Sequence, residues 1–290
     1  MLDLILQSIY SGLLSGGSYA LIGLGLALVF GTMKVINLAH GELVLLAAYI
    51  AYTVETRFGL NPLLSIPIAL VLVCLTSVIV YFLLSRIRKN RELNSLILTF
   101  GIGIMLTNLV LAIWSADIHS TGFSWFQEPV VFGPFYAMHS ELVFFGVSLV
   151  LVVMLWWWLN RSWYGRALRA VSSNRNAAML MGINPQRIEV VSFIVAGILA
   201  TFAGEAIYCS SVIQPALGQY LTVKAFIITV LAGVGSIPGV LLGALLLGVA
   251  ESLTVTLYSS ALQELSGMVL FLVVLFILPN GLFGASRRRG

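Results

Sequence analysis

The chain has 290 residues, of which 60% are hydrophobic and only 9% are charged, and its mean hydropathy is +1.04. An ordinary globular domain carries roughly 25% charged residues, so this composition excludes a water-soluble protein. The net charge of +4 comes from basic residues in short loops beside apolar stretches, which excludes the continuous basic stripe of a nucleic-acid-binding protein.

Apolar stretches close to twenty residues long recur along the chain, and about twenty residues let a helix cross about 30 Å of hydrocarbon. The predicted spans are residues 4–30, 36–53, 63–84, 93–114, 142–159, 190–208, 221–234, 240–253 and 265–278. The seventh and eighth are short enough to form one re-entrant pair instead. We therefore expect an all-α polytopic transmembrane bundle of about eight or nine spans, with residues 1–290 forming one domain.

The basic residues predict the orientation, because Lys and Arg beside span ends stay in the cytoplasm. In a nine-span arrangement, every Lys and Arg except Arg57 and Lys224 falls on one face. The long connection on the opposite face, residues 115–141, contains no Lys or Arg. We expect the amino terminus outside the cell and the carboxyl terminus inside.

Residues 235–239 read Gly-Ser-Ile-Pro-Gly and interrupt the apolar sequence between the seventh and eighth spans. Gly235, Gly239 and Gly243 are spaced by four, which on one continuous helix would align small residues for close helix packing. The proline inside this string equally suits a turn between two short helices. Of the two interpretations, we favour the turn.

Two loops are polar enough to carry a role of their own. Residues 115–141 are acidic and aromatic, which suits either an extracytoplasmic docking surface or a plain aromatic belt at the headgroups. Residues 160–188 contain five arginines and predict two short helices, one over 163–172 and one with Asn174 or Asn176 as its N-cap that stops at Gly182. A simple interfacial helix pair with no partner is the alternative for this inner loop.

The sequence lacks the motifs that ATP hydrolysis or metal-dependent catalysis would need. The chain contains neither the Gly-x-x-x-x-Gly-Lys-Ser/Thr phosphate loop nor a His-Glu-x-x-His string. Of the three histidines, His119 and His139 lie in the outer loop and only His40 lies in a predicted span. We therefore expect a transport subunit without its own ATPase, cofactor or metal.

A few ionisable residues fall at membrane depth, where each is costly unless it is paired or faces water. Asn37, His40 and Glu42 are expected to be neighbours near the inner end of the second span. Glu205 lies in the sixth predicted span and Glu251 towards the end of the eighth. A substrate path or gate is one interpretation. The other is that these groups satisfy one another or cap broken backbone between helices.

Four separated strings of the sequence carry a family resemblance. The most specific is Asn-Leu-Ala-His-Gly-Glu at 37–42, which follows a glycine-rich run at 15–31. The others are Gly-Arg-Ala-Leu-Arg-Ala at 165–170 with its following small residues, the run at 231–239 and the ending at 279–284. In this order they resemble the permease subunits of branched-chain amino acid ABC importers, nearly from end to end.

The resemblance implies that residues 160–188 are the coupling loop, in which such permeases carry a Glu-Ala-Ala-x-x-x-Gly pattern that docks into an ATPase subunit. Asn176 stands here in place of the glutamate, whereas the two alanines and the glycine are kept, so basic side chains are expected to supply the ionic contacts. The expected coupling residues are Gly165, Arg166, Arg169, Arg175, Asn176, Ala177, Ala178, Gly182, Asn184 and Pro185.

The resemblance also implies alternating access between two permease chains. Substrate would pass between spans along a path or gate that includes Tyr19, Asn37, His40, Gly41, Glu42 and Glu205. The expected partners are a second, related permease that forms a heterodimer, two ABC ATPase subunits that bind the ATP, a periplasmic substrate-binding protein, and the lipid of the inner membrane.

The expected substrates are branched-chain or related hydrophobic amino acids, while permeases of this kind for urea, amides or other amino acids remain alternatives. A secondary carrier or channel that works without partners is a rival class, and neighbouring genes for ATPases and a binding protein would argue against it. A purely structural membrane subunit is the other rival, and it predicts that Glu42→Gln or Asn37→Ala leaves uptake unchanged.

Overall fold

The computed structural model describes residues 1–87, 89–233, 236–278 and 281–283. Its helices are α1 (Leu2–Met33), α2 (His40–Phe58), η1 (Pro62–Ser65), α3 (Ile66–Ser85), α4 (Arg91–Trp114), α5 (Ser124–Gln127), α6 (His139–Arg161), α7 (Trp163–Ser173), α8 (Arg175–Leu180), α9 (Pro185–Ser210), α10 (Leu217–Ala232), α11 (Ile237–Leu257), η2 (Ser260–Leu262) and α12 (Gln263–Ile277). The two strands are β1 (Pro129–Phe132) and β2 (Phe135–Met138).

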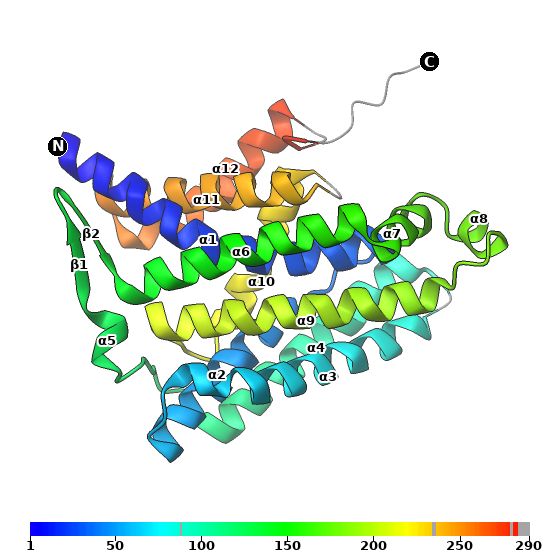
Figure 1. The fold of residues 1–290 in the computed structure, drawn as a ribbon, viewed down its shortest axis with the longest axis horizontal. Coiled ribbons are helices and arrows are strands. Elements are labelled where there is room, and N and C mark those ends of the chain that lie inside the picture. The colour runs from blue at the N-terminus through cyan, green and yellow to red at the C-terminus, as the bar shows by residue number, and fades with distance from the viewer. Residues whose placement is uncertain (88, 234–235, 279–280, 284–290) are drawn as a thin grey trace.

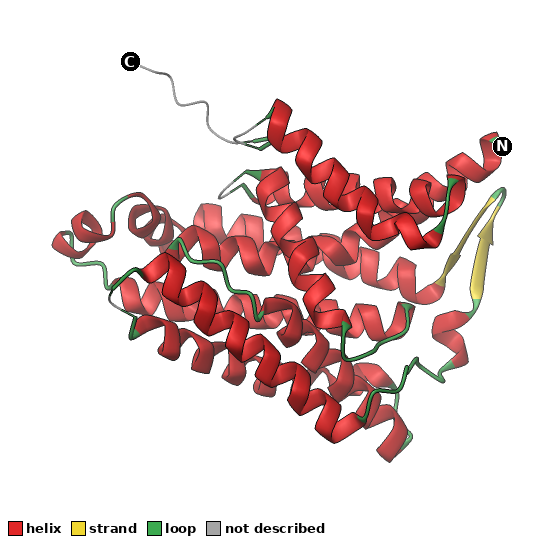
Figure 2. Ribbon diagram, turned by 180° about the vertical axis from the view of Figure 1, so that it is seen from behind, coloured by secondary structure: helices red, strands yellow, loops and turns green. Residues whose placement is uncertain are grey.

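The long helices lie side by side along the long axis of the molecule, so the bundle has two distinct ends (Figure 1). The hairpin end carries α5, β1, β2 and the start of α1, where the Gln7 side chain bonds the backbone of Tyr136 in both directions at 2.8 and 3.1 Å. The opposite end carries residues 160–188, which include α7 and α8. We call this segment the knob and this end of the bundle the knob end. Figure 2 shows both ends from behind.

In the described part of the chain, seven helical segments are long and apolar enough to cross a membrane. They are α1, η1 with α3, α4, α6, α9, α11, and η2 with α12. Their outward faces carry exposed apolar side chains such as Val71, Met105, Val150 and Leu272, as expected where lipid replaces water. The chain is therefore a multi-pass membrane protein, mostly helical as the sequence predicts.

Helices α2 and α10 do not belong to that set, since α10 has only 16 residues and α2 carries Glu42, Glu55 and Arg57. Both also begin in the middle of the bundle. The His40 ring at the start of α2 bonds the carbonyl oxygen of Ile22, halfway along α1, at 3.1 Å. A Cβ on Gly25 would lie between this ring and the carbonyl oxygen of Ala196, near the middle of α9. Residues 34–39 therefore return from the knob end as a non-helical segment that ends in a turn. Residues 211–216 do the same from the hairpin end before α10.

These elements form two similar units that run in opposite directions. The first unit is α1, the non-helical segment 34–39, α2 and α3, and the second is α9, the non-helical segment 211–216, α10 and α11. Helix α1 packs on α9 and α11, and α9 packs in turn on α1 and α3. Since α1 starts at the hairpin end and α9 at the knob end, the units are inverted repeats, an arrangement that transporters use to place a site between two broken helices.

The sequence explains why α2 starts as late as His40. Lys34 ends α1 in the left-handed conformation, with φ of 56°. The Asn37 side-chain oxygen accepts the backbone N–H of Ala39 at 3.1 Å, and its carbonyl accepts that of His40 at 3.3 Å. The predicted helix over 36–53 is thus wrong at its start. Asn37, His40 and Glu42 lie in the middle of the bundle instead of near the inner end of a span.

The break between α10 and α11 is confirmed. Helix α10 ends at Ala232 and α11 begins at Ile237, where the Ser236 hydroxyl accepts the backbone N–H of Gly239 at 3.1 Å. Pro238 occupies the first turn, where its missing N–H costs nothing. The structure describes neither residue 234 nor residue 235, so Gly235 of the predicted turn lies outside the described residues.

The hairpin of β1 and β2 is the part of the fold that an all-helical prediction misses. Its antiparallel register pairs Pro129 with Met138 and Phe132 with Phe135. Gly133 in the turn has φ of 60°, a backbone conformation that glycine adopts without strain. Four-residue strands inside an aromatic loop leave too short an alternating pattern to be recognised in the sequence.

Candidate functional site

The point where helices α2 and α10 meet is a tightly packed polar region of the bundle interior. The backbone N–H of Gly41 donates to the Thr222 hydroxyl at 2.9 Å, which joins α2 to α10. A Cβ on Gly41 would overlap the carbonyl oxygen of Gly218, and one on Gly218 would overlap the Glu42 carboxyl. The junction therefore requires glycine at position 41, where the added Cβ would meet backbone atoms of α10, while at Gly218 it would displace the Glu42 carboxyl.

Glu42 lies inside this junction and is only 2% exposed. Its carboxyl packs against Gly218 at the start of α10, where backbone N–H groups favour negative charge. Among the described residues, Glu42 Oε2 and His40 Nδ1 have no hydrogen-bond partner. Of the six predicted path residues, the structure brings four together here: Asn37, His40, Gly41 and Glu42.

Glu205 is not part of the junction. It lies on α9 towards the hairpin end, fully buried, and accepts a hydrogen bond from the Ser65 hydroxyl of η1. The neighbouring Gly204 is in contact with the backbone of α2 at Val44. Glu205 thus joins η1 to α9 and stands apart from the other predicted path residues.

Tyr19 belongs to a second polar cluster that sequence reasoning did not assemble. Lys224 Nζ on α10 donates to Tyr19 Oη at 2.9 Å and to Glu251 Oε2 on α11 at 2.8 Å. The Tyr19 hydroxyl also donates to Glu251 Oε2 at 2.9 Å, and the Gln263 amide of α12 reaches the same oxygen at 3.1 Å. Four helices therefore meet around one ion pair.

The knob is built as the sequence predicts. Helix α7 covers residues 163–173, and the Asn174 side chain caps α8 by accepting the backbone N–H groups of Asn176 and Ala177 at 3.1 and 3.0 Å. Gly182 follows with φ of 81°. Asn184 then caps α9, whose first residue is Pro185. Of the two N-caps proposed for α8, the structure selects Asn174.

A buried carboxylate fixes the knob to the bundle. Glu189 on α9 is 1% exposed, and its Oε1 lies 3.1 Å from Arg175 Nε and 4.0 Å from a guanidinium nitrogen of Arg91. The Tyr81 hydroxyl of α3 donates to its Oε2 at 3.4 Å. Arg175, predicted to face the ATPase, is therefore also held from inside the chain, at the first residue of α8.

The base of the knob packs tightly against the end of α6. A Cβ on Gly165 would overlap the backbone of Leu159. The Tyr164 hydroxyl donates to the carbonyl oxygen of Ile188 at 2.6 Å and shares a 2.7 Å hydrogen bond with Ser192. Burial raises the pKa of Tyr164 to about 12, so this hydroxyl stays protonated at neutral pH. These contacts hold α7 against α9.

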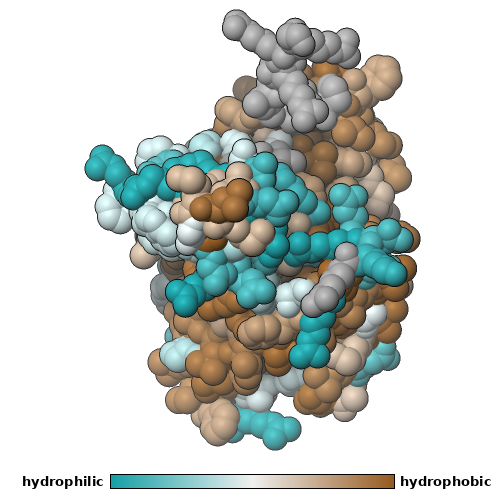
Figure 3. Space-filling model, turned by 90° about the vertical axis from the view of Figure 1, so that its right-hand side faces the viewer, coloured by the Kyte–Doolittle hydropathy of each residue, from teal (hydrophilic) through white to brown (hydrophobic). Residues whose placement is uncertain are grey.

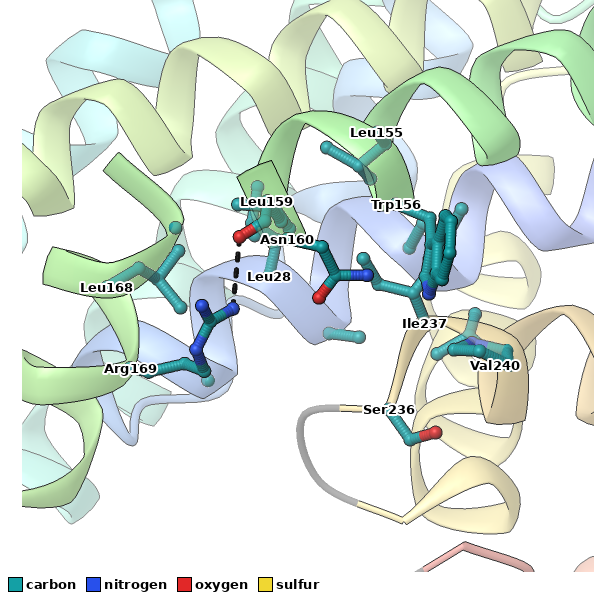
Figure 4. A pocket seen from close by; sticks show the side chains of 15 residues that line it. Leu28, Leu155, Trp156, Leu159, Asn160, Leu168, Arg169, Ser236, Ile237 and Val240 are labelled. Carbon is teal, nitrogen blue, oxygen red and sulfur yellow. Dashed lines mark hydrogen bonds between the residues drawn. The ribbon is translucent and has the colours of Figure 1, made fainter. Parts of the chain in front are cut away.

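A cavity of about 340 Å³ lies where α1, α6, α7 and the start of α11 approach one another (Figure 4). Its walls are mostly apolar, and Asn160 and Arg169 are the polar side chains at its α6 and α7 sides. Arg169 donates to the carbonyl oxygen of Leu159 at 3.0 Å, and Arg166 to that of Arg161 at 3.3 Å. The cavity is lined by two predicted coupling residues, Gly165 and Arg169, and by none of the predicted path residues.

The tip of the knob presents an apolar patch within a hydrophilic face. Leu180 is 89% exposed and Met181 82% exposed, and a shallow groove beside them is lined by Asn174, Ala177 and Ala178. Figure 3 views this end of the molecule and shows hydrophilic side chains gathered around a small hydrophobic patch. Leu180 and Met181 are thus the most exposed large apolar side chains of the knob.

At the hairpin end, Glu55 connects the outer loop to the bundle. The Glu55 carboxylate of α2 accepts hydrogen bonds from the Thr121 hydroxyl at 2.7 Å, the Gly122 N–H at 2.5 Å and the Tyr208 hydroxyl at 2.9 Å. Two backbone hydrogen bonds, at 2.9 and 2.7 Å, pair His119 with Ile213 in the extended segment before α10. Residues 115–141 thus contact both broken-helix units.

Three polar contacts of the structure could not be predicted from the sequence: the Lys224–Glu251 pair, the contacts of Glu189 and the contacts of Glu55. Their partners lie 27, 14 and 66 residues away along the chain. One signal was available, because the position of Lys224 in an apolar stretch already makes it an unusual cation. No spacing in the sequence identifies Glu251 as its partner.

Comparison with known proteins agrees with this arrangement. The family described as branched-chain amino acid transport system / permease component matches residues 8–278. The permease protein BraD of the high-affinity branched-chain amino acid transport system of Pseudomonas aeruginosa is 31% identical over 96% of this chain and 95% of its own. The permease protein LivM of the corresponding Escherichia coli system is 25% identical over 93% of this chain and 68% of its own.

Among solved structures, PsaBC from Streptococcus pneumoniae in complex with Fab shares the fold. The TM-score is 0.53 with 12% sequence identity, and the alignment covers 93% of this chain and 92% of that one. The family match over nearly the whole chain, together with the identity to BraD, confirms the resemblance seen in the sequence. The chain belongs to the family of branched-chain amino acid transport system permease components.

Proposed function

We propose that this chain is the transmembrane permease subunit of an ATP-binding-cassette importer that moves branched-chain or related hydrophobic amino acids across the inner membrane. The observation that carries the proposal is the family match over residues 8–278. BraD and LivM are both named as permeases of high-affinity branched-chain amino acid transport systems. The chain supplies the path, while other subunits supply the energy.

The proposed topology has nine crossings, with the amino terminus outside and the carboxyl terminus inside. Seven crossings are the long apolar helices, and two are composite, each made of a non-helical segment followed by α2 or α10. This count places the knob with its arginines inside and residues 115–141 outside, in agreement with the retention of basic residues in the cytoplasm. Residues 1–290 then form one permease domain.

The knob is the proposed docking element for the ATPase. Its capped helix α8 exposes Leu180 and Met181, and Ala177 and Ala178 leave a shallow groove beside them. Asn176 replaces an acidic residue, so Arg166 and Arg169, both exposed on α7, carry the charge of this surface. ATP is bound by two partner ATPase subunits.

The other proposed partners are a second permease and a periplasmic substrate-binding protein. Similarity to both BraD and the more distant LivM supports a heterodimer of two related permeases. The outer loop, with the exposed side chains of Trp125, Phe132 and Tyr136, is the proposed surface for the binding protein.

The proposed path runs past the α2–α10 junction and the Tyr19 cluster. Asn37, His40, Gly41 and Glu42 hold the starts of two broken helices together at the middle of the bundle, which is where transporters of inverted-repeat design bind substrate. Glu205 is assigned to the same path as a gate residue nearer the hairpin end.

The test measures uptake by membrane vesicles that contain the complete transporter, prepared in the right-side-out and the inside-out orientation. We expect radiolabelled leucine to enter right-side-out vesicles in an ATP-dependent manner, with excess valine competing. Uptake of radiolabelled urea or acetamide without uptake of leucine would overturn the assigned substrate class. An empty-vector membrane preparation is the control.

A further inference from the structure

The cluster of Tyr19, Lys224 and Glu251 contains the cation that the described part of the chain buries at membrane depth. The Lys224 side chain is 14% exposed and that of Glu251 only 3% exposed. An ionisable side chain within a membrane protein is costly, so it marks a functional position by default. Lys224 lies on α10, two residues after Thr222 of the junction with α2, and Glu251 lies on α11.

The geometry around Lys224 leaves it able to bind another group. An ammonium has three N–H donors, and the described structure uses two of them, towards Tyr19 and Glu251. The ammonium also lies 4.4 Å from the centre of the Tyr19 ring, over its face. Lys224 is thus held in place by two neighbours, with one donor remaining.

The surface of α10 next to Lys224 is polar and open. Gln219 and Tyr220 are exposed, and so is Val223 beside Lys224. At this depth an exposed amide and hydroxyl are unfavourable against lipid, so this face of α10 fits a water-filled path or a partner chain better than the bilayer.

An ion pair with partial access matches one class of ligand. A free amino acid carries a carboxylate and an ammonium a few atoms apart, and these charges complement a lysine and a glutamate that already pair with each other. Urea and simple amides carry no such charges. Lys224 and Glu251 therefore match the carboxylate and ammonium groups that free amino acids share, and other residues must select the side chain of the substrate.

We propose that Lys224 binds the carboxylate of a zwitterionic amino acid during translocation, while Glu251 receives its ammonium group and Tyr19 holds Lys224 in place. This inference rests on the proposed function, which supplies the substrate class. Lys224 and Glu251 contact the substrate, and Tyr19 is a positioning residue.

The test uses the complete transporter in proteoliposomes, with radiolabelled leucine as the probe. Lys224→Gln is expected to lower the leucine uptake rate by about ten- to a hundredfold, the loss typical of a hydrogen bond to a charged group. ATP hydrolysis stimulated by the loaded binding protein is expected to persist, since the knob is untouched. Arg57→Gln, at the exposed end of α2, is the control with unchanged uptake.

The double variant Lys224→Gln with Glu251→Gln separates substrate binding from a structural lock. It leaves no unpaired buried charge, so a lock alone predicts that it recovers transport relative to the single variant. Our proposal predicts that it stays as slow as Lys224→Gln. Recovery of uptake, loss of stimulated ATP hydrolysis in the single variant, or failure of the double variant to assemble with its ATPase would each overturn the proposal.

Leucine uptake by the wild-type complex distinguishes failure of the proposed function from failure of the proposed role of Lys224 and Glu251. If wild-type proteoliposomes take up no leucine, the proposed function fails. If the wild type takes up leucine and Lys224→Gln does so at the same rate, only the assignment of Lys224 and Glu251 fails.

Discussion

Arg175 Nε lies 3.1 Å from Glu189 Oε1, and this contact joins the first residue of α8 to the buried start of α9. The same carboxylate approaches Arg91 at the beginning of α4 and Tyr81 on α3. A movement of α8, as the proposed docking of an ATPase would cause, would therefore reach three bundle helices through one residue. Glu189 is positioned to transmit the motion of the knob.

Replacing the Glu189 carboxylate is expected to uncouple ATP hydrolysis from substrate transport. In Glu189→Gln the ion pairs with Arg175 and Arg91 are lost, which costs on the order of 1–3 kcal/mol of stability where a charged partner is left unmatched. We expect ATP hydrolysis by the assembled complex to continue while substrate uptake falls several-fold. The measurement is the ratio of substrate moved to ATP hydrolysed in proteoliposomes.

The matched control for that experiment is Glu92→Gln, because Glu92 lies on the exposed side of the first turn of α4. It should leave the ratio unchanged. An unchanged ratio in Glu189→Gln as well would show that the knob moves the bundle by another route.

The α2–α10 junction should tolerate no added methyl group. Gly41→Ala places a Cβ onto the backbone of Gly218 and Thr222, and overpacking of this kind costs about 1–3 kcal/mol. We expect a lower unfolding temperature of the purified protein in detergent and reduced uptake. Gly101→Ala on α4 meets no atom within 4 Å and is the control. Equal unfolding temperatures for both variants would argue against close contact at the junction.

Glu55 should determine how firmly the outer loop is held. Glu55→Ala removes the acceptor for Thr121, Gly122 and Tyr208, and each unmade bond of a buried group costs about 1–3 kcal/mol. We expect protease to cut within residues 115–141 more than tenfold faster than in the wild type. Glu128→Ala changes an exposed carboxylate of the same loop. If both variants were cut at the same rate, Glu55 would not be the anchor.

The exposed tip of the knob should decide ATPase binding without affecting the fold. Met181→Asp places a charge on a side chain that is 82% exposed, so the unfolding temperature of the permease should stay within about 1–2 °C of wild type, as for most surface changes. Co-purification of the ATPase should fall several-fold. Met268→Asp, which is half-exposed on the membrane-facing α12, tests whether any new charge on an apolar surface has this effect.

The sequence predicts the spans and the knob well because both depend on local patterns. Apolar length identifies the long helices, and Asn174, Gly182 and Pro185 punctuate the knob in the manner that helix caps require. The start of α2 is different. Residues 34–39 include Val35, Ile36 and Leu38, yet the Asn37 side chain and a hydrogen bond from Thr222 of α10 to the carbonyl oxygen of Leu38 keep them out of a helix.

The polar clusters of the bundle depend on contacts between distant residues and so escape prediction from one sequence. Tyr19 and Glu251 are 232 residues apart, and only the crossing of α1 with α11 brings them together. Glu205, predicted to share a path with Glu42 because both are acids at membrane depth, accepts a hydrogen bond from Ser65 of η1 and stands apart from the junction. The type of a residue indicates that its side chain is important, whereas the side chains that contact it in the fold determine its role.

The central claim is that this chain is a path driven by separate ATPases. The direct measurement is leucine uptake by proteoliposomes that contain this permease and its partner permease, with and without the ATPase subunits, ATP and the binding protein. We predict uptake only when all are present, at a rate that follows ATP hydrolysis. Uptake of leucine at a comparable rate by vesicles that lack the ATPase would contradict the claim.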